Sequence, residues 1–309
     1  MSENMFSMNM RSVITPSIQT LKHPCAGTLW ALDFDQRGMG RAAFCESRAS
    51  GPTGTNSLQP ATIQRQLNAQ LGGWRQRKFP RWVWVNPKAD AFLEGARDLG
   101  ASTEAAVSTL ATRRIGALIH TRGGMPAGER LVMIGRRFPG LLRVDLAFFS
   151  ARIDRRCVWE RGASPNESRF ELLNELKRHG IEVGIRLGPI IPGVNDEADD
   201  WAPILERVAQ LGVTDVVPYW LEPSRRLMTQ IRREVSSQAT QRIEAVLYSG
   251  DDTRLMQWQI STMNTIRRRA LPLGLDVKRC TCGPERSGSA ACVVGPKEGR
   301  ESRQLALFG

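Results

Sequence analysis

The chain has 309 residues, of which 41% are hydrophobic and 24% are charged, and these values exclude wholesale disorder. Its longest apolar runs are too short for a membrane-spanning helix, and residues 1–17 lack the apolar core of a secretory signal, so we expect a cytoplasmic protein with no membrane partner. The net charge is +12, and the excess of Lys and Arg lies in residues 1–80 and 223–309. A basic surface favours a polyanion such as nucleic acid, although a bias toward Arg codons would give the same composition.

Hydrophobic periodicity predicts strands that alternate with helices along the chain. Ser164 is expected to cap the fourth helix, with Pro165 at its first position and Glu167 completing a capping box, and Gly180 is expected to end it. Alternation of this kind predicts an α/β fold with parallel strands and with helices packed outside them. The predicted strands are residues 28–34, 81–85, 117–121, 142–149, 181–187 and 213–219, and the predicted helices are 59–71, 102–113, 127–137, 165–179, 201–211 and 237–248.

Six strand–helix units predict a partial (β/α)6 TIM-like barrel, because a complete barrel has eight units; a doubly wound sheet is the alternative. The predicted division is an N-terminal extension (1–27), the barrel (28–250), and a basic, partly irregular C-terminal appendix (251–309). In either architecture, ligands bind where strands end and helices begin. The loops that follow the strands are therefore the candidate functional site.

The segment 144–196 carries the most distinctive motifs. They are Ser150 at a strand end, Trp159-Glu160 and Gly162-Ala-Ser-Pro165 in the next loop, Arg169 early in the following helix, and Pro189-Ile-Ile-Pro-Gly-Val-Asn-Asp196 after the next strand. In this order they resemble the radical S-adenosylmethionine superfamily, and within it the branch of spore photoproduct lyase and the DNA repair photolyase-like proteins. The resemblance covers about residues 28–222. It implies a partial barrel that cleaves S-adenosylmethionine reductively and abstracts hydrogen from a nucleic-acid-related substrate, as an enzyme of the lyase or oxidoreductase type.

The same resemblance implies two cofactors, a [4Fe–4S] cluster and S-adenosylmethionine. Arg186 lies within a strand and needs an anionic partner if it points into the barrel; a ligand carboxylate and an internal Glu such as Glu160 are the alternatives. Ser150 is expected to bond either a ligand or the local backbone. The residues that the resemblance assigns to S-adenosylmethionine are Ser150, Glu160, Arg186, Pro189, Ile190, Pro192 and Gly193.

The cluster motif is degenerate. The family uses CxxxCxxC after the first strand, because three thiolates hold the iron–sulfur cluster. Here Cys45 matches the last cysteine, but Ala42 and Gly38 stand where the other two are expected. Three interpretations follow. In the first, the remaining cluster ligands come from elsewhere in the chain. In the second, the barrel has lost its cluster and is a nucleic-acid-binding or scaffold protein. In the third, the chain is another α/β barrel. In the first case the metal ligands would be Cys45, Cys25, Cys280, Cys282 and Cys292.

Clustered arginines predict where nucleic acid would bind, because each Arg can neutralise a phosphate. Solvated helix faces are the alternative. His120 has no second His at metal-ligand spacing and is expected to be structural, as are Trp82 and Trp84. The arginines assigned to nucleic acid are Arg225, Arg226, Arg232, Arg233, Arg267, Arg268 and Arg269.

Overall fold

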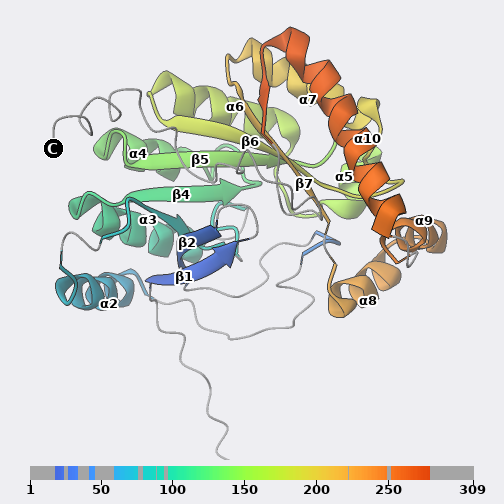
Figure 1. Cartoon of the computed structure of the whole chain (residues 1–309). Coiled ribbons are helices and arrows are strands. Elements are labelled where there is room, and N and C mark those ends of the chain that lie inside the picture. The colour runs from blue at the N-terminus through green and yellow to red at the C-terminus, as the bar shows by residue number, and fades with distance from the viewer. Residues whose placement is uncertain are drawn as a thin grey trace, which may run out of the picture.

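The computed structural model describes residues 18–23, 27–33, 42–45, 59–75, 79–87, 89–93, 97–221, 223–248 and 252–278. Within these ranges, eight strands form one sheet in chain order (Figure 1). The first pair, β1–β2, is antiparallel, and each later pair is parallel. The strands are β1 (Ile18–His23), β2 (Gly27–Leu32), β3 (Trp82–Val85), β4 (Gly116–Thr121), β5 (Leu142–Phe148), β6 (Glu182–Ile190), β7 (Asp215–Trp220) and β8 (Asp276–Val277).

Helices follow the parallel strands and cover the outer face of the curved sheet (Figure 1). The sheet is open, since no pairing joins β1 to β8 in the described part of the chain. The predicted α/β partial barrel is therefore confirmed. The helices are α2 (Pro60–Gly72), α3 (Arg97–Thr112), α4 (Glu129–Arg137), α5 (Ile153–Trp159), α6 (Asn166–Arg178), α7 (Ala198–Gln210), α8 (Arg225–Glu234), α9 (Ser237–Leu247), α10 (Asp252–Ala270) and the 3-10 turn η2 (Leu271–Leu273).

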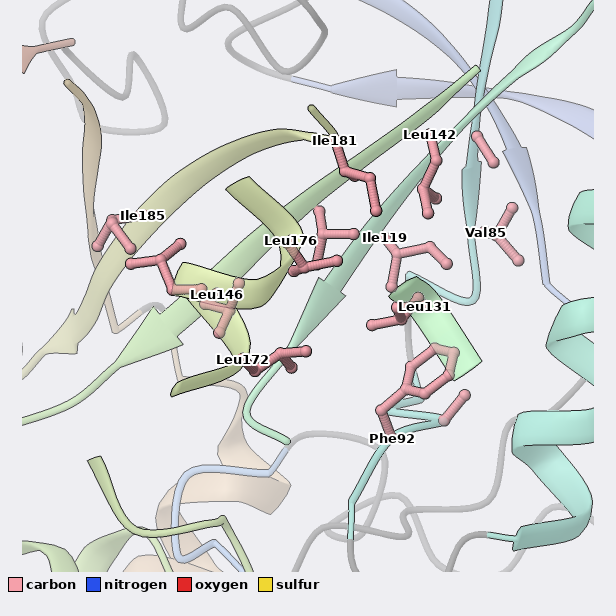
Figure 2. Close-up of a cluster of buried hydrophobic side chains, with 14 of the residues drawn as sticks. Val85, Phe92, Ile119, Leu131, Leu142, Leu146, Leu172, Leu176, Ile181 and Ile185 are labelled. Carbon is pink, nitrogen blue, oxygen red and sulfur yellow. The ribbon is translucent and has the colours of Figure 1, made fainter. Parts of the chain in front are cut away.

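The hydrophobic core lies between the outer face of the sheet and the helices. Because side chains alternate along a strand, every second strand residue points toward the helices. Val85, Ile119, Leu146 and Ile185 are such residues on four neighbouring strands, and all are buried. Figure 2 shows these side chains gathered with Leu131 of α4 and with Leu172 and Leu176 of α6. This packing fixes which strand residues face the inside of the barrel.

Two segments outside the predicted barrel contribute strands to its sheet. β1 lies in the predicted N-terminal extension and is held at the sheet edge by Gln70, whose side-chain amide accepts from the Ile18 N–H (2.9 Å) and donates to the Ile18 carbonyl (3.0 Å). β8 and α10 lie in the predicted appendix; β8 pairs with β7, and α10 packs beside α7 (Figure 1). The division into domains stays a prediction. No helix among the described segments is both long and apolar enough to cross a membrane.

The expected cap of α6 is wrong in detail. Ser164 Oγ accepts a hydrogen bond from the Gly124 N–H (2.9 Å), so it ties α6 to the loop after β4 and leaves the helix without a side-chain cap. The helix begins at Asn166, one residue after Pro165. Gly180 does end it, with a φ of +68°, a left-handed conformation that favours glycine.

Candidate functional site

The carboxyl ends of the parallel strands form a rim that carries a second set of buried apolar side chains, the rim cluster. Helix α8 reaches this rim because it follows β7 closely and inserts Leu227, Met228 and Ile231 into the cluster. Ser224 caps α8 by accepting from the Leu227 N–H. The rim cluster consists of Ala42, Ala43, Phe44, Phe149, Trp159, Ile191, Val194, Leu221, Leu227, Met228, Ile231 and Ile243.

Residues 42–45, the described part of the loop after β2, are packed into the rim cluster. The Ala43 N–H donates to the Trp159 carbonyl (2.8 Å), and Gln230 Nε2 donates to the Ala43 carbonyl (2.9 Å). The Phe44 ring stacks on Phe149 with ring centroids 5.2 Å apart. This segment is thus fixed between α5 and α8 by both backbone and side-chain contacts.

The described residues at this loop do not fit a three-thiolate cluster. Cys45 is half-buried against the rim cluster, which also contains Ile191 from the turn after β6. Ala42, at the position of a second ligand, is buried and has no ligating atom. No group of three metal-ligating side chains occurs in the described part of the chain, and Cys157 is exposed on α5. The remaining predicted ligands, Cys25, Cys280, Cys282 and Cys292, lie outside the described residues.

Glu160 is the buried centre of an ion-pair network at the rim. Arg169 donates Nη1 and Nη2 to its two oxygens at 3.0 and 2.8 Å, and both side chains are 0% exposed. Arg122 Nε lies 3.3 Å from the same carboxylate. Glu160 therefore pairs with Arg169 and Arg122, and it is not the internal partner of Arg186 that the sequence analysis considered.

Ser150 and the turn after β6 are also occupied by internal contacts. Ser150 is fully buried, donates to Asp200 Oδ1 (2.7 Å) and accepts from the Arg152 N–H, which is the local alternative considered above. Asn195 ties the turn by accepting from the Ile191 N–H and donating to the carbonyls of Pro189 and Phe149. Ile190 ends β6, Pro192 is buried, and Gly193 is exposed with a φ of +68°.

Arg122, Asp90 and Tyr219 are rim residues to which no individual role was assigned from the sequence. Arg122 donates to the Tyr219 hydroxyl, and its guanidinium lies 5.0 Å from the Phe44 ring centroid. Its backbone N–H donates to Asp90 Oδ2 (2.6 Å), and Thr121 Oγ1 donates to the other oxygen (2.7 Å). Burial raises the pKa of the Asp90 carboxyl, and it likewise raises the pKa of the Tyr219 phenol, which therefore stays protonated at neutral pH.

The inner face of the sheet is polar, in contrast to the branched apolar residues that usually fill a barrel. Arg143 is 1% exposed and donates to Asp145 (2.9 Å) and Glu182 (2.8 Å). Gly184 makes room for this group, because a Cβ there would lie 2.5 Å from the Arg143 guanidinium and 2.6 Å from Asp145. Lys278 pairs with Asp215 (3.1 Å) deeper in the barrel. These charges tie β5, β6, β7 and the residue after β8 together.

His120 lies in the layer above Arg143. Its Nε2 is 3.4 Å from Asp145 Oδ2, and its ring is 4.6 Å from the Trp84 ring. Burial, and then the charge of Arg186, lower the pKa of His120 to about 4, so the imidazole is neutral at pH 7. Burial alone would raise the pKa of Asp145, but the hydrogen bond to His120 and the charge of Arg143 outweigh it and lower that pKa.

The predicted nucleic-acid residues fall in two separate places. Arg225, Arg226 and Arg233 are exposed on α8 at the rim, while the nearby Arg232 pairs with Glu244. The group Arg267–Arg269 ends α10 near the opposite end of the sheet, because β8 begins a few residues later beside the first residue of β7. The seven arginines therefore do not form one continuous patch.

Comparison with solved structures agrees with this architecture. No protein-family model and no curated protein matches the sequence. A spore photoproduct lyase complexed with a dinucleoside spore photoproduct matches with a TM-score of 0.60 and 13% identity, covering 85% of this chain and 79% of that one. A double mutant of that enzyme with bound AdoMet (S-adenosylmethionine) and the same dinucleoside matches with a TM-score of 0.59 and 15% identity, over 84% and 78% of the two chains.

The fold is therefore similar to that of spore photoproduct lyase, and the resemblance inferred from the sequence is confirmed at the level of the fold. At identities this low the likeness does not carry over an activity, which has to be argued from the site.

Proposed function

We propose that this protein binds nucleic acid through the carboxyl rim of its barrel and does so without a CxxxCxxC iron–sulfur cluster. The observation that carries the proposal is Ala42, a buried side chain without a ligating atom at the place of a cluster thiolate. The neighbouring Phe44 packs on Phe149 and under the Arg122 guanidinium, so apolar contacts occupy this part of the loop. A fold can persist after the chemistry that its relatives perform has been lost.

Nucleic acid is the proposed partner for two reasons. The α8 arginines Arg225, Arg226 and Arg233 are exposed at the rim, and no ion pair of Arg225, Arg226 or Arg233 occurs in the described residues. Guanidinium groups in such positions bind phosphates and release counterions from nucleic acid. In addition, the similar spore photoproduct lyases are complexed with a dinucleoside.

The nucleic-acid part is tested by fluorescence anisotropy of a labelled DNA oligonucleotide at several salt concentrations. Replacing both Arg225→Gln and Arg226→Gln is expected to reduce the slope of log K against log salt by roughly 1.5, since each lost phosphate contact changes it by about 0.7–0.9. Arg178→Gln is the matched control, because Arg178 is an exposed arginine at the far end of α6. Equal salt slopes for the α8 variant and the wild type would overturn this part of the proposal.

The cluster part is tested by anaerobic reconstitution of the full chain with iron and sulfide. A colourless protein that still binds DNA supports the proposal. Incorporation of about four irons per chain, lost in Cys45→Ser but retained in Cys157→Ser, overturns it. That result would favour the alternative of a radical S-adenosylmethionine enzyme whose further ligands come from Cys25, Cys280, Cys282 and Cys292.

A further inference from the structure

Arginines gather at the amino ends of the parallel strands, which are the tails of the arrows in Figure 1 and lie opposite the carboxyl rim. A helix that follows a parallel strand runs back along the sheet, so it ends beside the amino end of the next strand. α3 and α4 end in this way before β4 and β5, and α10 ends shortly before β8. The arginines in or directly after the last turns of these three helices form the amino-end patch, which consists of Arg113, Arg114, Arg136, Arg137, Arg268 and Arg269.

The patch extends across neighbouring elements. The strands β4 to β8 pair in order near their first residues, and α3 packs against α4, α4 against α6, and α7 against α10. Lys177, in the last turn of α6, donates to the Leu211 carbonyl (2.8 Å) and so joins the end of α6 to the segment before β7. The exposed Arg207 in the last turn of α7 adds a further charge between the two ends of the patch.

The charges of the patch are not neutralised within the described residues. None of the six arginines forms an ion pair there, and all except the half-buried Arg113 are exposed. Acids at this end lie beside other cations: Glu175 pairs with Arg178 (2.7 Å), and Asp276 lies 3.9 Å from Lys278. Arg178 is paired and is therefore not counted in the patch.

Helix dipoles explain only part of this arrangement. Residues 81–222 are balanced in charge, but acids such as Glu129, Glu167 and Asp199 lie in the first helical turns at the rim, whereas basic residues lie at the other end. A dipole favours both placements. However, α2 also ends at the amino end of the sheet, and its last turn contains no basic residue. The dipole thus does not by itself require a row of arginines.

We propose that the amino-end patch binds the phosphate backbone of double-stranded nucleic acid. The four strand spacings from β4 to β8, at about 4.8 Å each, span about 19 Å. A DNA duplex carries one charge per ~1.7 Å of its axis, so about 11 phosphate charges fall within that span. Arginine suits them because its donors form a planar fork that matches phosphate. A polymer can therefore contact several of these arginines at once.

Other polyanions fit this surface less well. Single strands bind by stacking their bases on aromatic rings, and no Phe, Tyr or Trp side chain is exposed in the described connections before β4 to β8. Membrane-bound segments present a continuous apolar face, whereas the large apolar side chains exposed near the patch, Met133 and Leu271, lie on different elements. The amino-end patch is also separate from the α8 arginines at the rim, so this proposal goes beyond the proposed function and can hold without it.

The test measures binding of a short fluorescent DNA duplex by anisotropy at several salt concentrations. It uses the full chain with Arg225→Gln and Arg226→Gln already in place, so that any contribution of α8 is reduced. In this background, replacing Arg136 and Arg137 by Gln is expected to reduce the slope of log K against log salt by about 1.8, because each duplex phosphate contact contributes about 0.9. Replacing Arg268 and Arg269 by Gln should reduce it equally.

The control variant, Arg65→Gln with Arg178→Gln, removes the same charge outside the patch. Arg65 is exposed on α2, and Arg178 is paired with Glu175. Its salt slope is expected to equal that of the background, and circular dichroism of every variant checks that it is folded. If the α8 proposal is wrong, the background binds as the wild type does, and the amino-end variants still report on the patch.

Lower salt slopes for both patch variants support the proposal. An unchanged slope for either of them, or an equal loss in the control, would overturn it. Tighter binding of the single strand than of the duplex would also contradict it. Vesicles containing phosphatidylserine test the membrane alternative: the proposal is wrong if the patch variants lose vesicle binding while their binding to the duplex is unchanged.

Discussion

Removal of the Glu160 charge is expected to destabilise the whole rim. Glu160 and Arg169 are both 0% exposed and share two hydrogen bonds, so Glu160→Gln leaves one fully buried guanidinium without its counter-ion. Breaking one side of a buried ion pair costs about 3–5 kcal/mol, since the remaining charge stays desolvated. For a chain of this size, Tm should fall by roughly 6–10 °C, at about 2 °C per kcal/mol. Urea unfolding followed by circular dichroism measures the loss of unfolding free energy.

The surface pair Arg178–Glu175 is the matched control, because it has the same chemistry on an exposed helix face. Glu175→Gln should cost less than about 0.5 kcal/mol. The double variant Glu160→Gln with Arg169→Met is expected to be less destabilised than the sum of the single variants, since the buried charge has gone. The reasoning fails if Glu160→Gln unfolds at the same urea concentration as the wild type.

Two further predictions concern the inner face and a rim loop. The pKa of His120 is about 4 in the folded chain and 6.5 in the unfolded chain. As the pH falls, the unfolded chain therefore binds a proton before the folded chain does. The free energy of unfolding should fall by up to about 3 kcal/mol between pH 6.5 and pH 4. In urea titrations at several pH values, the free energy of unfolding of His120→Gln should depend less on pH between 6.5 and 4. An unchanged slope of unfolding free energy against pH would contradict the lowered pKa of His120. Gly123→Ala should destabilise the chain, because its Cβ would lie 2.0 Å from the Phe92 carbonyl oxygen. Gly72→Ala is the control, because nothing lies within contact distance of a Cβ at this end of α2, and it should be neutral or stabilising by up to about 1 kcal/mol. Thermal unfolding compares the Gly123→Ala and Gly72→Ala variants. Equal Tm values would contradict the close approach of Gly123 to Phe92.

Elements with a strong local pattern were predictable from sequence. The six predicted strands all occur as β2 to β7, with ends that differ by a few residues, because each is a short, largely apolar run between helical patterns. The two-residue strand β8 carries no such pattern and exists only because β7 lies beside it. β1 pairs along its whole length with the adjacent strand β2, and the Gln70 side chain, more than fifty positions away, also holds its first residue; that distant contact leaves no local mark in the sequence.

The site was predictable only in part. The resemblance drew attention to the loops after β2 and β6, and the structure packs Cys45 and Ile191 of these loops in one cluster. It assigned Ser150 and Glu160 to a ligand. In the structure, Ser150 instead bonds Asp200 of α7, and Glu160 pairs with Arg169 of α6. Both partners lie on other elements, so the residues around Ser150 and Glu160 do not reveal them. The polar inner face did leave a signal: charges two residues apart within otherwise apolar strands, as in Arg143-Val-Asp145, must share one face of the sheet.

The charged pairs on the inner face of the barrel contribute little to stability. Burying Arg143 and its carboxylates gains little over a well-packed apolar layer of the same volume, since desolvation offsets much of the attraction. The outer face of the same strands shows that this sequence supplies branched apolar residues where only packing matters. The Arg143 layer fixes Asp145, Asp145 lies against His120, and the half-buried Arg186 stands beside them. These contacts join β5 to β4, to β6 and to β7, so the charges specify how neighbouring strands are arranged more than they add stability.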